Sequence, residues 1–306
     1  MTLQQLRYLI AVAEYGSINA AAGNLYTSQS NVSAAISELE RELGVEVFTR
    51  SNRGVTLTND GTELLGYARQ VVEQADLLSQ RFKQKKAAGA RLAVSTQHYA
   101  FSLQAFVNVV EEFRGAEFDF VLRETTTAQI IEDVSQFRSE VGVIYLDDFN
   151  KRVLRRALAD ARCAFCELFE ADVHVFVGTG HPLAAKASVR LGDLAPYARY
   201  NFEQGTVNSF HYSEEPLAYI PCSKTIRYTD RATLTNLLTS YNGYTLSTGV
   251  LTDEMQSGIV SIPLEDAPVM RVGYIMHEER RPTELVGRYI AELERVVAAN
   301  PNVEAR

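Results

Sequence analysis

The 306-residue sequence predicts an α/β chain in three parts, and three patterns support this prediction. Apolar residues recur at helical spacing through the first 43 residues. A second helical pattern runs from 59 to 86 without a proline, and strands alternate with helices from residue 90. Such alternation predicts a layered α/β fold, and this length fits two or three domains.

Two short helices open the chain. Gly16 separates them, and Ser17 is placed to cap the second one. The three alanines at 20–22 permit the close helix crossing that a helix-turn-helix needs, with the turn at 26–27. The residues predicted to face inward are Leu6, Leu9, Ile10, Ala13, Ile18, Ala21, Ala22 and Leu25.

A third helix is predicted over 28–43, with one apolar and one polar face. Ser28 can cap its start, and Gly44 supplies a left-handed stop. Gln can contact adenine edges through two hydrogen bonds, and Ser can bond base edges or phosphates, so the polar face predicts DNA recognition. The predicted apolar stripe is Val32, Ile36, Leu39 and Leu43. The candidate DNA contacts are Ser28, Gln29, Ser30, Asn31, Ser33 and Ser37, with Ser17 and Asn19 from the second helix.

A hairpin is predicted after Gly44. Residues 45–48 alternate as a strand, 50–54 form a polar turn, and 55–57 return. Arg50 and Arg53 lie where the wing of a winged helix-turn-helix would meet phosphate or the minor groove.

Residues 1–66 resemble the N-terminal domain of the LysR-type transcriptional regulators. The matching residues stand at the family's spacing: Ser28-Gln29, Ser33, Ile36, Leu39-Glu40, Leu43-Gly44, Phe48, Arg50, Arg53, Leu57-Thr58 and Gly61. Asn31 stands where a small apolar residue is common, and Asp60 where alanine is usual. The resemblance implies a regulator that binds double-stranded promoter DNA.

The charge of the first part departs from the usual footprint of a DNA-binding domain. Residues 1–58 carry four arginines and five glutamates, a net charge of −1, where a basic domain is typical. Glu40 and Glu42 come late on the third helix, while both wing arginines cluster. Weak non-specific affinity, offset by doubled contacts in a dimer, is expected. The alternative is a winged helix that docks on protein.

One long helix is predicted over 59–86, within a linker region of 59–89 that ends in a short polar hinge. Its apolar stripe is too long to be hidden within the helix itself, so it must pack on a partner, either within one subunit or between two. The family resemblance implies an antiparallel pairing of two chains, hence a homodimer or homotetramer. The stripe consists of Leu64, Leu65, Ala68, Val71, Val72, Ala75, Leu78 and Phe82.

Residues 90–306 carry the remaining negative charge, −8, and show a β-α-β-α-β pattern. Strands are predicted at 91–95, 118–122 and 141–145 and helices at 99–113 and 127–137, which calls for a parallel sheet. A second series begins at 172–177 and includes 191–194, 200–202, 224–228, 232–241 and 244–247; strand 270–277 and helix 282–299 return to the first lobe. The resemblance implies two lobes like those of type 2 periplasmic binding proteins, lobe I at about 90–162 plus 267–306 and lobe II at about 163–266, with an effector between them.

Hydroxyl and amide side chains follow several of these predicted strands. Ligands of open α/β sheets bind beyond the carboxyl ends of strands, and helix N-termini attract anions. Each hydroxyl taken singly is more often an ordinary helix cap, but their shared position after strands predicts a site for a polar or anionic small molecule. The candidates are Ser95, Thr96, Gln97, Thr126, Thr127, Phe202, Gln204, Thr248 and Gly249.

The three cysteines and five histidines predict no metal site or cofactor. Cys163 and Cys166 have the spacing of a redox or metal motif, but a strand points residues i and i+3 to opposite faces, and no second pair completes a zinc set. Buried structural cysteines are therefore expected at 163 and 166.

Other classes of protein use less of the sequence. No catalytic residues or nucleotide-binding motif are found, so an enzyme is not expected. A winged helix fused to a catalytic or constitutive solute-binding-like domain is the alternative. A cytoplasmic protein is expected, with no membrane partner, because no apolar run approaches the ~20 residues that span a bilayer. RNA polymerase is a further candidate partner.

Overall fold

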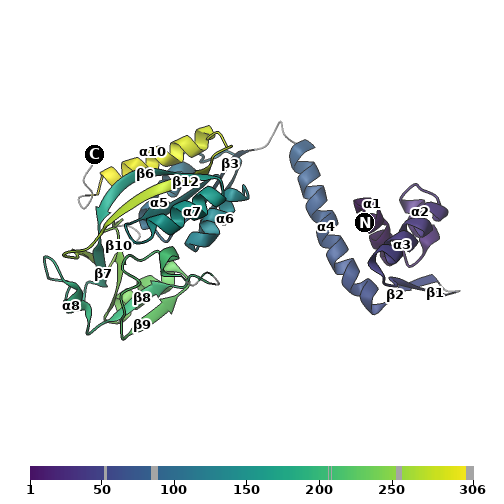
Figure 1. Cartoon of the computed structure of the whole chain (residues 1–306). Helices are drawn as coiled ribbons and strands as arrows, with labels where there is room; N and C mark the ends of the chain where they lie inside the picture. The colour runs from purple at the N-terminus through teal and green to yellow at the C-terminus, as the bar shows by residue number, and fades with distance from the viewer. Residues whose placement is uncertain (52–53, 84–88, 206, 208, 253–256, 301–306) are drawn as a thin grey trace. The chain divides into compact units, whose positions relative to one another are not determined.

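The structure is a computed structural model that describes residues 1–51, 54–83, 89–205, 207, 209–252 and 257–300 (Figure 1). The chain forms two compact units, Met1–Ala88 and Gly89–Arg306. Each unit has its own hydrophobic core.

The first unit is a three-helix core followed by a hairpin and a long helix. Its elements are α1 (Leu3–Tyr15), α2 (Ile18–Asn24), α3 (Gln29–Leu43), β1 (Phe48–Ser51), β2 (Gly54–Leu57) and α4 (Asn59–Lys83). Gly16 and Gly44 end α1 and α3 in the left-handed conformation, and the Ser17 and Ser28 hydroxyls cap α2 and α3. The predicted helix-turn-helix and wing are therefore present.

The predicted apolar stripe of α3 is buried except at its end. Val32, Ile36 and Leu39 are buried, but Leu43 is 40% exposed. Leu43 is the last helical residue before the Gly44 cap, so it projects beyond the core that covers the preceding turns. The prediction of a buried Leu43 is wrong.

The joint between the wing and α4 explains the Leu57-Thr58 and Gly61 motif physically. The Thr58 Oγ1 atom accepts a hydrogen bond from the Gly61 amide at 2.9 Å, and the Thr58 amide donates to the Val47 carbonyl at 3.1 Å. A Cβ atom on Gly61 would lie only 2.1 Å from that same carbonyl oxygen. Glycine is therefore required for α4 to begin against the strand segment.

Helix α4 packs on α1 along part of its length and exposes a second apolar face. Leu65 and Ala68 are buried, whereas Val71 is 45% and Leu78 is 58% exposed. Tyr67 is 60% exposed and shares the helical face of Val71 and Leu78, at spacings of four and eleven residues. The predicted single stripe is thus divided between an intramolecular and an exposed face.

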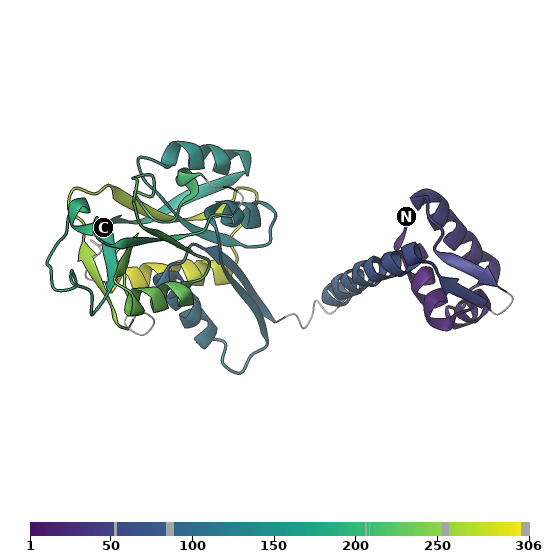
Figure 2. The ribbon, with the colours of Figure 1, turned by 90° about the horizontal axis from the view of Figure 1, so that it is seen from below.

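Lobe I of the second unit is a five-stranded sheet in the order β4-β3-β5-β12-β6 (Figures 1 and 2). Helices α5 and α10 pack on one face, while α6 and α7 pack on the other through Ile144 and Leu146. The elements are β3 (Ala90–Thr96), α5 (Ala100–Glu111), β4 (Phe118–Glu124), α6 (Thr127–Ser135), β5 (Val141–Leu146), α7 (Lys151–Asp160), β6 (Cys163–Asp172), β12 (Val269–His277) and α10 (Glu284–Ala298).

Lobe II is a second five-stranded sheet, in the order β11-β7-β10-β8-β9. Helix α9 covers one face through Leu234, Leu237 and Leu238, which pack on Tyr200 and neighbouring aromatic residues. The elements are β7 (His174–Gly178), α8 (Leu191–Leu194), β8 (Ala198–Phe202), η1 (Phe210–Tyr212), β9 (Thr225–Tyr228), α9 (Arg231–Ser240), β10 (Gly243–Ser247) and β11 (Ile259–Pro263).

The sheets differ from the prediction in two respects. Strand β12 runs antiparallel to β5 and β6, so the sheet of lobe I is mixed rather than wholly parallel. Strand β6 pairs with β12 from Cys163 to Asp172, which keeps it in lobe I, so the first crossing between lobes comes about ten residues later than the boundary predicted at 162–163. Helix α7 and strand β11 were not predicted as elements. The direction of β12 and the lobe of β6 could not be predicted locally, because a strand's place in a sheet depends on its distant pairing partner.

Candidate DNA-binding and effector sites

The start of α3 presents polar side chains to solvent. Gln29, Ser30 and Asn31 are exposed, while Val32 directly after them is fully buried. The Ser28 Oγ atom accepts the Asn31 amide at 3.2 Å and lies 2.9 Å from the Ser30 hydroxyl. Within the described residues no hydrogen bond holds the Gln29 side chain, so it remains available to a partner.

The other candidate DNA contacts lie around this face or outside the description. Asn19 and Ser37 are exposed, and Ser17 and Ser33 are half-buried. The Ser17 hydroxyl accepts the Ala20 amide at 3.4 Å as a helix cap. Arg53 lies outside the described residues, and for Arg50 only its backbone place in β1 is described.

Glu40, late on α3, is directed into the fold. The Glu40 Oε1 atom accepts hydrogen bonds from the Val47 and Phe48 amides at 2.9 and 3.2 Å. Glu40 therefore fixes α3 to the wing and is engaged away from the exposed start of the helix. One of the five glutamates that make residues 1–58 net negative is therefore held away from the proposed DNA-binding face.

The candidate effector residues of lobe I form a buried hydrogen-bond network. Gln97 Nε2 donates to Thr127 Oγ1 at 2.6 Å, and Gln97 Oε1 accepts from the Tyr99 hydroxyl at 2.9 Å and the Tyr145 amide at 3.2 Å. Ser95 instead donates to Asp133 at 2.7 Å. Because these groups satisfy one another, they have little hydrogen-bonding capacity left for a ligand.

The hydroxyl groups of three further candidates form hydrogen bonds with nearby backbone atoms. Thr126 caps α6 by accepting the Gln129 amide at 3.3 Å, and the Thr96 hydroxyl donates to the Gln97 carbonyl at 2.8 Å. Thr248 Oγ1 accepts the Val250 amide at 3.4 Å. Gly249 has a φ of +76°, and a Cβ there would lie 2.4 Å from the His174 ring, so it serves a close approach.

The boundary between the lobes is closed by the segment Ser213–Glu215. Glu214 of this segment lies 2.9 Å from His98 Nδ1 and also accepts the His98 amide at 3.2 Å. The Tyr145 hydroxyl of lobe I donates to the Ser213 carbonyl at 3.2 Å. The space left beside these residues measures only about 30 Å³.

Glu215 accepts hydrogen bonds beside Phe202, one of the candidate effector residues. Its Oε1 atom accepts the Phe202 amide at 2.7 Å and the Tyr228 hydroxyl at 3.0 Å, and its Oε2 atom accepts the Ser213 hydroxyl at 3.1 Å. The chain's own carboxyl group therefore occupies the donors beyond the end of β8. An anion approaching this cleft also meets Glu214 and Glu124.

Burial and like charge perturb the titration of this cluster. Burial, followed by the charge of Glu214, raises the pKa of Glu215 to about 8. Burial also raises the pKa of Glu124. For His98 burial opposes the charged form, but the Glu214 carboxylate outweighs it, so the pKa of His98 is raised. The cluster holds its protons more tightly than free side chains do.

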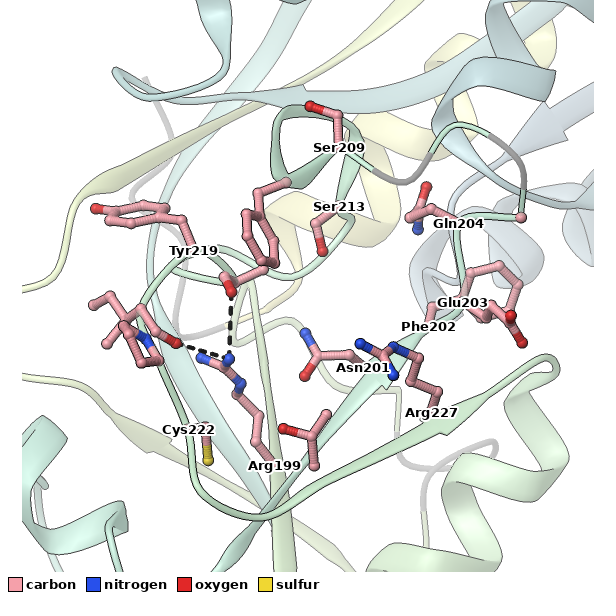
Figure 3. Close-up of a pocket in the computed structure, with 16 residues that line it drawn as sticks. Arg199, Asn201, Phe202, Glu203, Gln204, Ser209, Ser213, Tyr219, Cys222 and Arg227 are labelled. Atoms are coloured by element: carbon pink, nitrogen blue, oxygen red, sulfur yellow. Dashed lines mark hydrogen bonds between the residues drawn. The ribbon is translucent and has the colours of Figure 1, made fainter.

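A larger cavity of about 530 Å³ lies within lobe II (Figure 3). The candidates Phe202 and Gln204 line it, together with Arg199, Asn201 and Arg227. None of the other predicted effector residues lines this cavity. Its arginines and the closing pair Glu214-Glu215 were not predicted from the sequence. Adjacent glutamates between two aromatic-rich stretches are a visible but unspecific signal.

The cysteines follow the predicted strand geometry but not the predicted burial. Cys163 is buried and Cys166 is exposed, on opposite faces of β6, and all three cysteines are free thiols. The expectation that Cys166 is buried is wrong, because β6 is an edge strand whose outer positions face solvent. Across the described ranges, no group of three histidine, cysteine or acidic residues could hold a metal ion.

The fold and sites define a class before any comparison: a helix-turn-helix unit with a polar recognition face, joined to a two-lobed ligand-binding domain. A family model described as bacterial regulatory helix-turn-helix protein, lysR family, matches residues 3–62, and one described as LysR substrate binding domain matches residues 91–298. The chain belongs to the LysR family of regulators. No helix within the described residues is long and apolar enough to cross a membrane.

Individual relatives match only segments of this chain. The HTH-type transcriptional regulator ClcR of Pseudomonas putida is 47% identical over 77 residues, 25% of this chain and 26% of that protein. The HTH-type transcriptional regulator CzcR of Bacillus anthracis is 31% identical over 134 residues, 44% of this chain and 46% of that protein. The chain thus spans between about a quarter and a half of these relatives.

A solved structure shares the fold of the whole chain. The Corynebacterium glutamicum OxyR C206 mutant aligns with a TM-score of 0.52 and 20% sequence identity, covering 96% of this chain and 92% of that one. At this identity the likeness concerns the fold alone.

Proposed function

We propose that this protein controls transcription by binding double-stranded promoter DNA through the start of α3 and the wing. The observation that supports this most is the exposed polar face of Gln29, Ser30 and Asn31 above a fully buried Val32. A helix held in this way can enter the major groove while its other face stays in the core. The wing arginines, Arg50 and Arg53, would add contacts to phosphate or the minor groove.

Self-association through α4 would place two recognition helices on one operator. Tyr67, Val71 and Leu78 form an exposed apolar face on this helix, and a partner helix would remove it from water. A dimer also doubles the DNA contacts of a unit whose net charge is not basic. A homotetramer would build on the same pairing.

The unit of residues 89–306 would supply the response to a small molecule. Closure of the lobes by Ser213–Glu215 gives that unit a defined resting state. A ligand that binds one lobe arrangement better than the other shifts the population between them. RNA polymerase would be the downstream partner, and the cytoplasm, where promoter DNA is accessible, the location.

A regulator also explains the chain better than an enzyme does. The relatives that match it bear the names of transcriptional regulators. The ionisable cluster of the cleft, Glu124, Glu214, Glu215, His98 and Arg231, is engaged in internal contacts. These contacts hold the two lobes together and present no free nucleophile.

Replacing Gln29 with alanine tests the proposed DNA contact. A duplex selected from a random library against the full chain serves as the probe, and fluorescence anisotropy measures affinity. We expect Gln29→Ala to cost about 1–3 kcal/mol at its cognate base pair and to relax discrimination there. Gln4→Ala, an exposed glutamine on α1, is the matched control. Equal binding and equal specificity in both variants would remove α3 from the interface.

A further inference from the structure

The cavity of lobe II lies beside the crossover between β8 and β9, whose described residues form no α-helix. Strands β8 and β9 are parallel, so the chain between them must cross over the sheet, usually as a helix. In the described part of this crossover only the three residues Phe210–Tyr212 are helical. Helix α9 covers the opposite face, so this face at β8 and β9 is left to a loop.

Polar side chains lie on the face of β8 and β9 that is opposite α9. Arg199 and Asn201 alternate with the buried Tyr200, and in the pairing register Asn201 lies beside Arg227 of β9. Figure 3 shows the Asn201 amide between the two guanidinium groups. A purely structural face of a sheet would carry apolar residues here, because buried polar groups without partners are costly.

Several of these polar groups are buried and unpartnered. Arg199 is only 7% exposed; its terminal nitrogens donate to the Leu217, Ala218 and Ile220 carbonyls at 2.9–3.3 Å, which leaves its Nε–H unbonded. The Asn201 Oδ1 atom and both amide atoms of Gln204 also lack partners. The site therefore offers at least one donor and one acceptor for either orientation of the Gln204 amide.

The charge of the cavity favours an anionic ligand. Arg199 and Arg227 face a single lining carboxylate, that of Glu203, which is exposed. Arg227 forms no ion pair within the described residues, so its planar guanidinium can receive a carboxylate through two hydrogen bonds. The unpartnered Gln204 and Asn201 oxygens additionally require donors. A sulfate ion supplies none, whereas an amino or hydroxyl group does.

We propose that this cavity is a binding site for a small amino- or hydroxycarboxylate. Its volume of about 530 Å³ lies within the range of small-molecule sites. This proposal specifies the chemistry of the ligand and the place where it binds. It rests on the proposed function only for the role of that ligand in regulation. The site is distinct from the interlobe cleft, where Glu215 and Glu214 accept hydrogen bonds from Phe202 and His98.

The walls of the cavity connect it to the lobe boundary. Ser213 lines the cavity and its carbonyl accepts the Tyr145 hydroxyl of lobe I. Tyr219, another lining residue, stacks on Phe149 of lobe I with ring centroids 4.1 Å apart. A ligand that moves this loop therefore changes contacts between the lobes, which gives binding a route to the rest of the domain.

The test uses the full chain and a defined panel of probes. Each proteinogenic L-amino acid and a set of 2-hydroxycarboxylates, at millimolar concentration, are screened by thermal shift, and hits are measured by calorimetry; sodium sulfate is the control. We expect one or more panel members, and not sulfate, to raise the melting temperature. No binder in the panel, or an equal shift with sulfate, would overturn the proposal.

Variants separate ligand binding from structure. Arg227→Gln, at an exposed position, should weaken the hit at least tenfold, while Arg152→Gln on α7 of lobe I should not. Gln204→Leu removes two unpartnered buried groups, so it should preserve or raise apo stability and still lose affinity. Unchanged affinity in both Arg227→Gln and Gln204→Leu would overturn the site.

Thiol labelling reports the location directly. Cys222 lines the cavity and Cys166 is exposed on lobe I, so the hit should slow alkylation of Cys222 and leave Cys166 unchanged. Equal rates with and without ligand would overturn the location. Gln29→Ala should retain this protection while weakening operator binding, so failure of the DNA proposal is distinguishable from failure of this one.

Discussion

Glu215 shows at the scale of one residue how the fold reassigns a predicted binding position. Phe202 was expected to meet a ligand, yet its amide, together with the Tyr228 hydroxyl, binds this carboxyl group. Its pKa is raised to about 8 by burial and by Glu214. The folded protein therefore holds a proton that the unfolded chain would release at neutral pH.

The stability of the full chain should fall as pH rises from about 5 to about 8. Glu215 ordinarily has a pKa of 4.5, so the raised folded value stabilises the native state below that and the contribution is lost as pH rises through 8. His98, whose pKa is also raised, acts in the same direction. Chemical denaturation across this pH range measures the effect.

Glu215→Gln should flatten this pH dependence. The amide keeps one acceptor for the Phe202 amide and removes the titrating proton. Glu203→Gln, which changes an exposed carboxylate one residue from Phe202, is the control and should leave the slope as in wild type. A slope that is unchanged in Glu215→Gln would show that Glu215 does not carry the dependence.

The apolar residues of helix α4 form two faces, one buried against the first unit and one exposed to solvent. Ala68 is buried in the winged core, with Leu64 and Val72 packed against it. The ion pairs of Arg7 with Asp76 and of Arg69 with Glu14 add contacts to α1. Tyr67, Val71 and Leu78 remain exposed on the adjoining face. The intramolecular packing therefore leaves a defined surface for a second chain.

Charges on the exposed face of α4 should separate subunits and weaken operator binding together. Val71→Asp with Leu78→Asp would bury two carboxylates in the proposed seam at a cost of several kcal/mol. Gln70→Asp, about a quarter-turn round the helix from Val71, is the control. Light scattering and anisotropy measure the two effects; a wild-type monomer with full operator affinity would contradict this role of α4.

In the effector unit as a whole, side-chain contacts between lobe I and lobe II hold the two lobes together. Arg231 of lobe II lies 3.3 Å from Glu124 of lobe I, with about a fifth of each side chain exposed. The His98 ring lies over Phe202, with centroids 3.8 Å apart. Polar and aromatic contacts therefore act together across the boundary.

A double-mutant cycle on Arg231 and Glu124 measures this closure. Arg231→Met leaves Glu124 half-buried without its cation and should destabilise the chain by about 1–3 kcal/mol. Adding Glu124→Gln should recover part of the loss, with a coupling energy of about 0.5–3 kcal/mol. The same cycle on the i,i+4 pair Arg156 and Asp160, a surface ion pair, is the control. Coupling no larger than in that control would contradict a role for this pair in closure.

Local patterns by themselves determined the helix-turn-helix, the wing and the order of most strands and helices. Caps, glycine stops and apolar spacing depend on neighbouring residues, so Ser28, Gly44 and Val32 could be interpreted from the chain alone. The candidate DNA face followed from the same periodicity. Gln29, Ser30 and Ser37 are exposed, whereas Ser33 is half-buried.

Only the tertiary structure decided which polar residues pair with each other and which are left without a partner. Gln97 and Thr127 satisfy each other across 30 residues, and Glu214 reaches His98 across 116, distances in sequence that no local pattern encodes. The placement of β6 in lobe I depends in the same way on its pairing with β12. The cavity of lobe II likewise depends on the pairing of β8 with β9, which brings Arg199, Asn201 and Arg227 to one site.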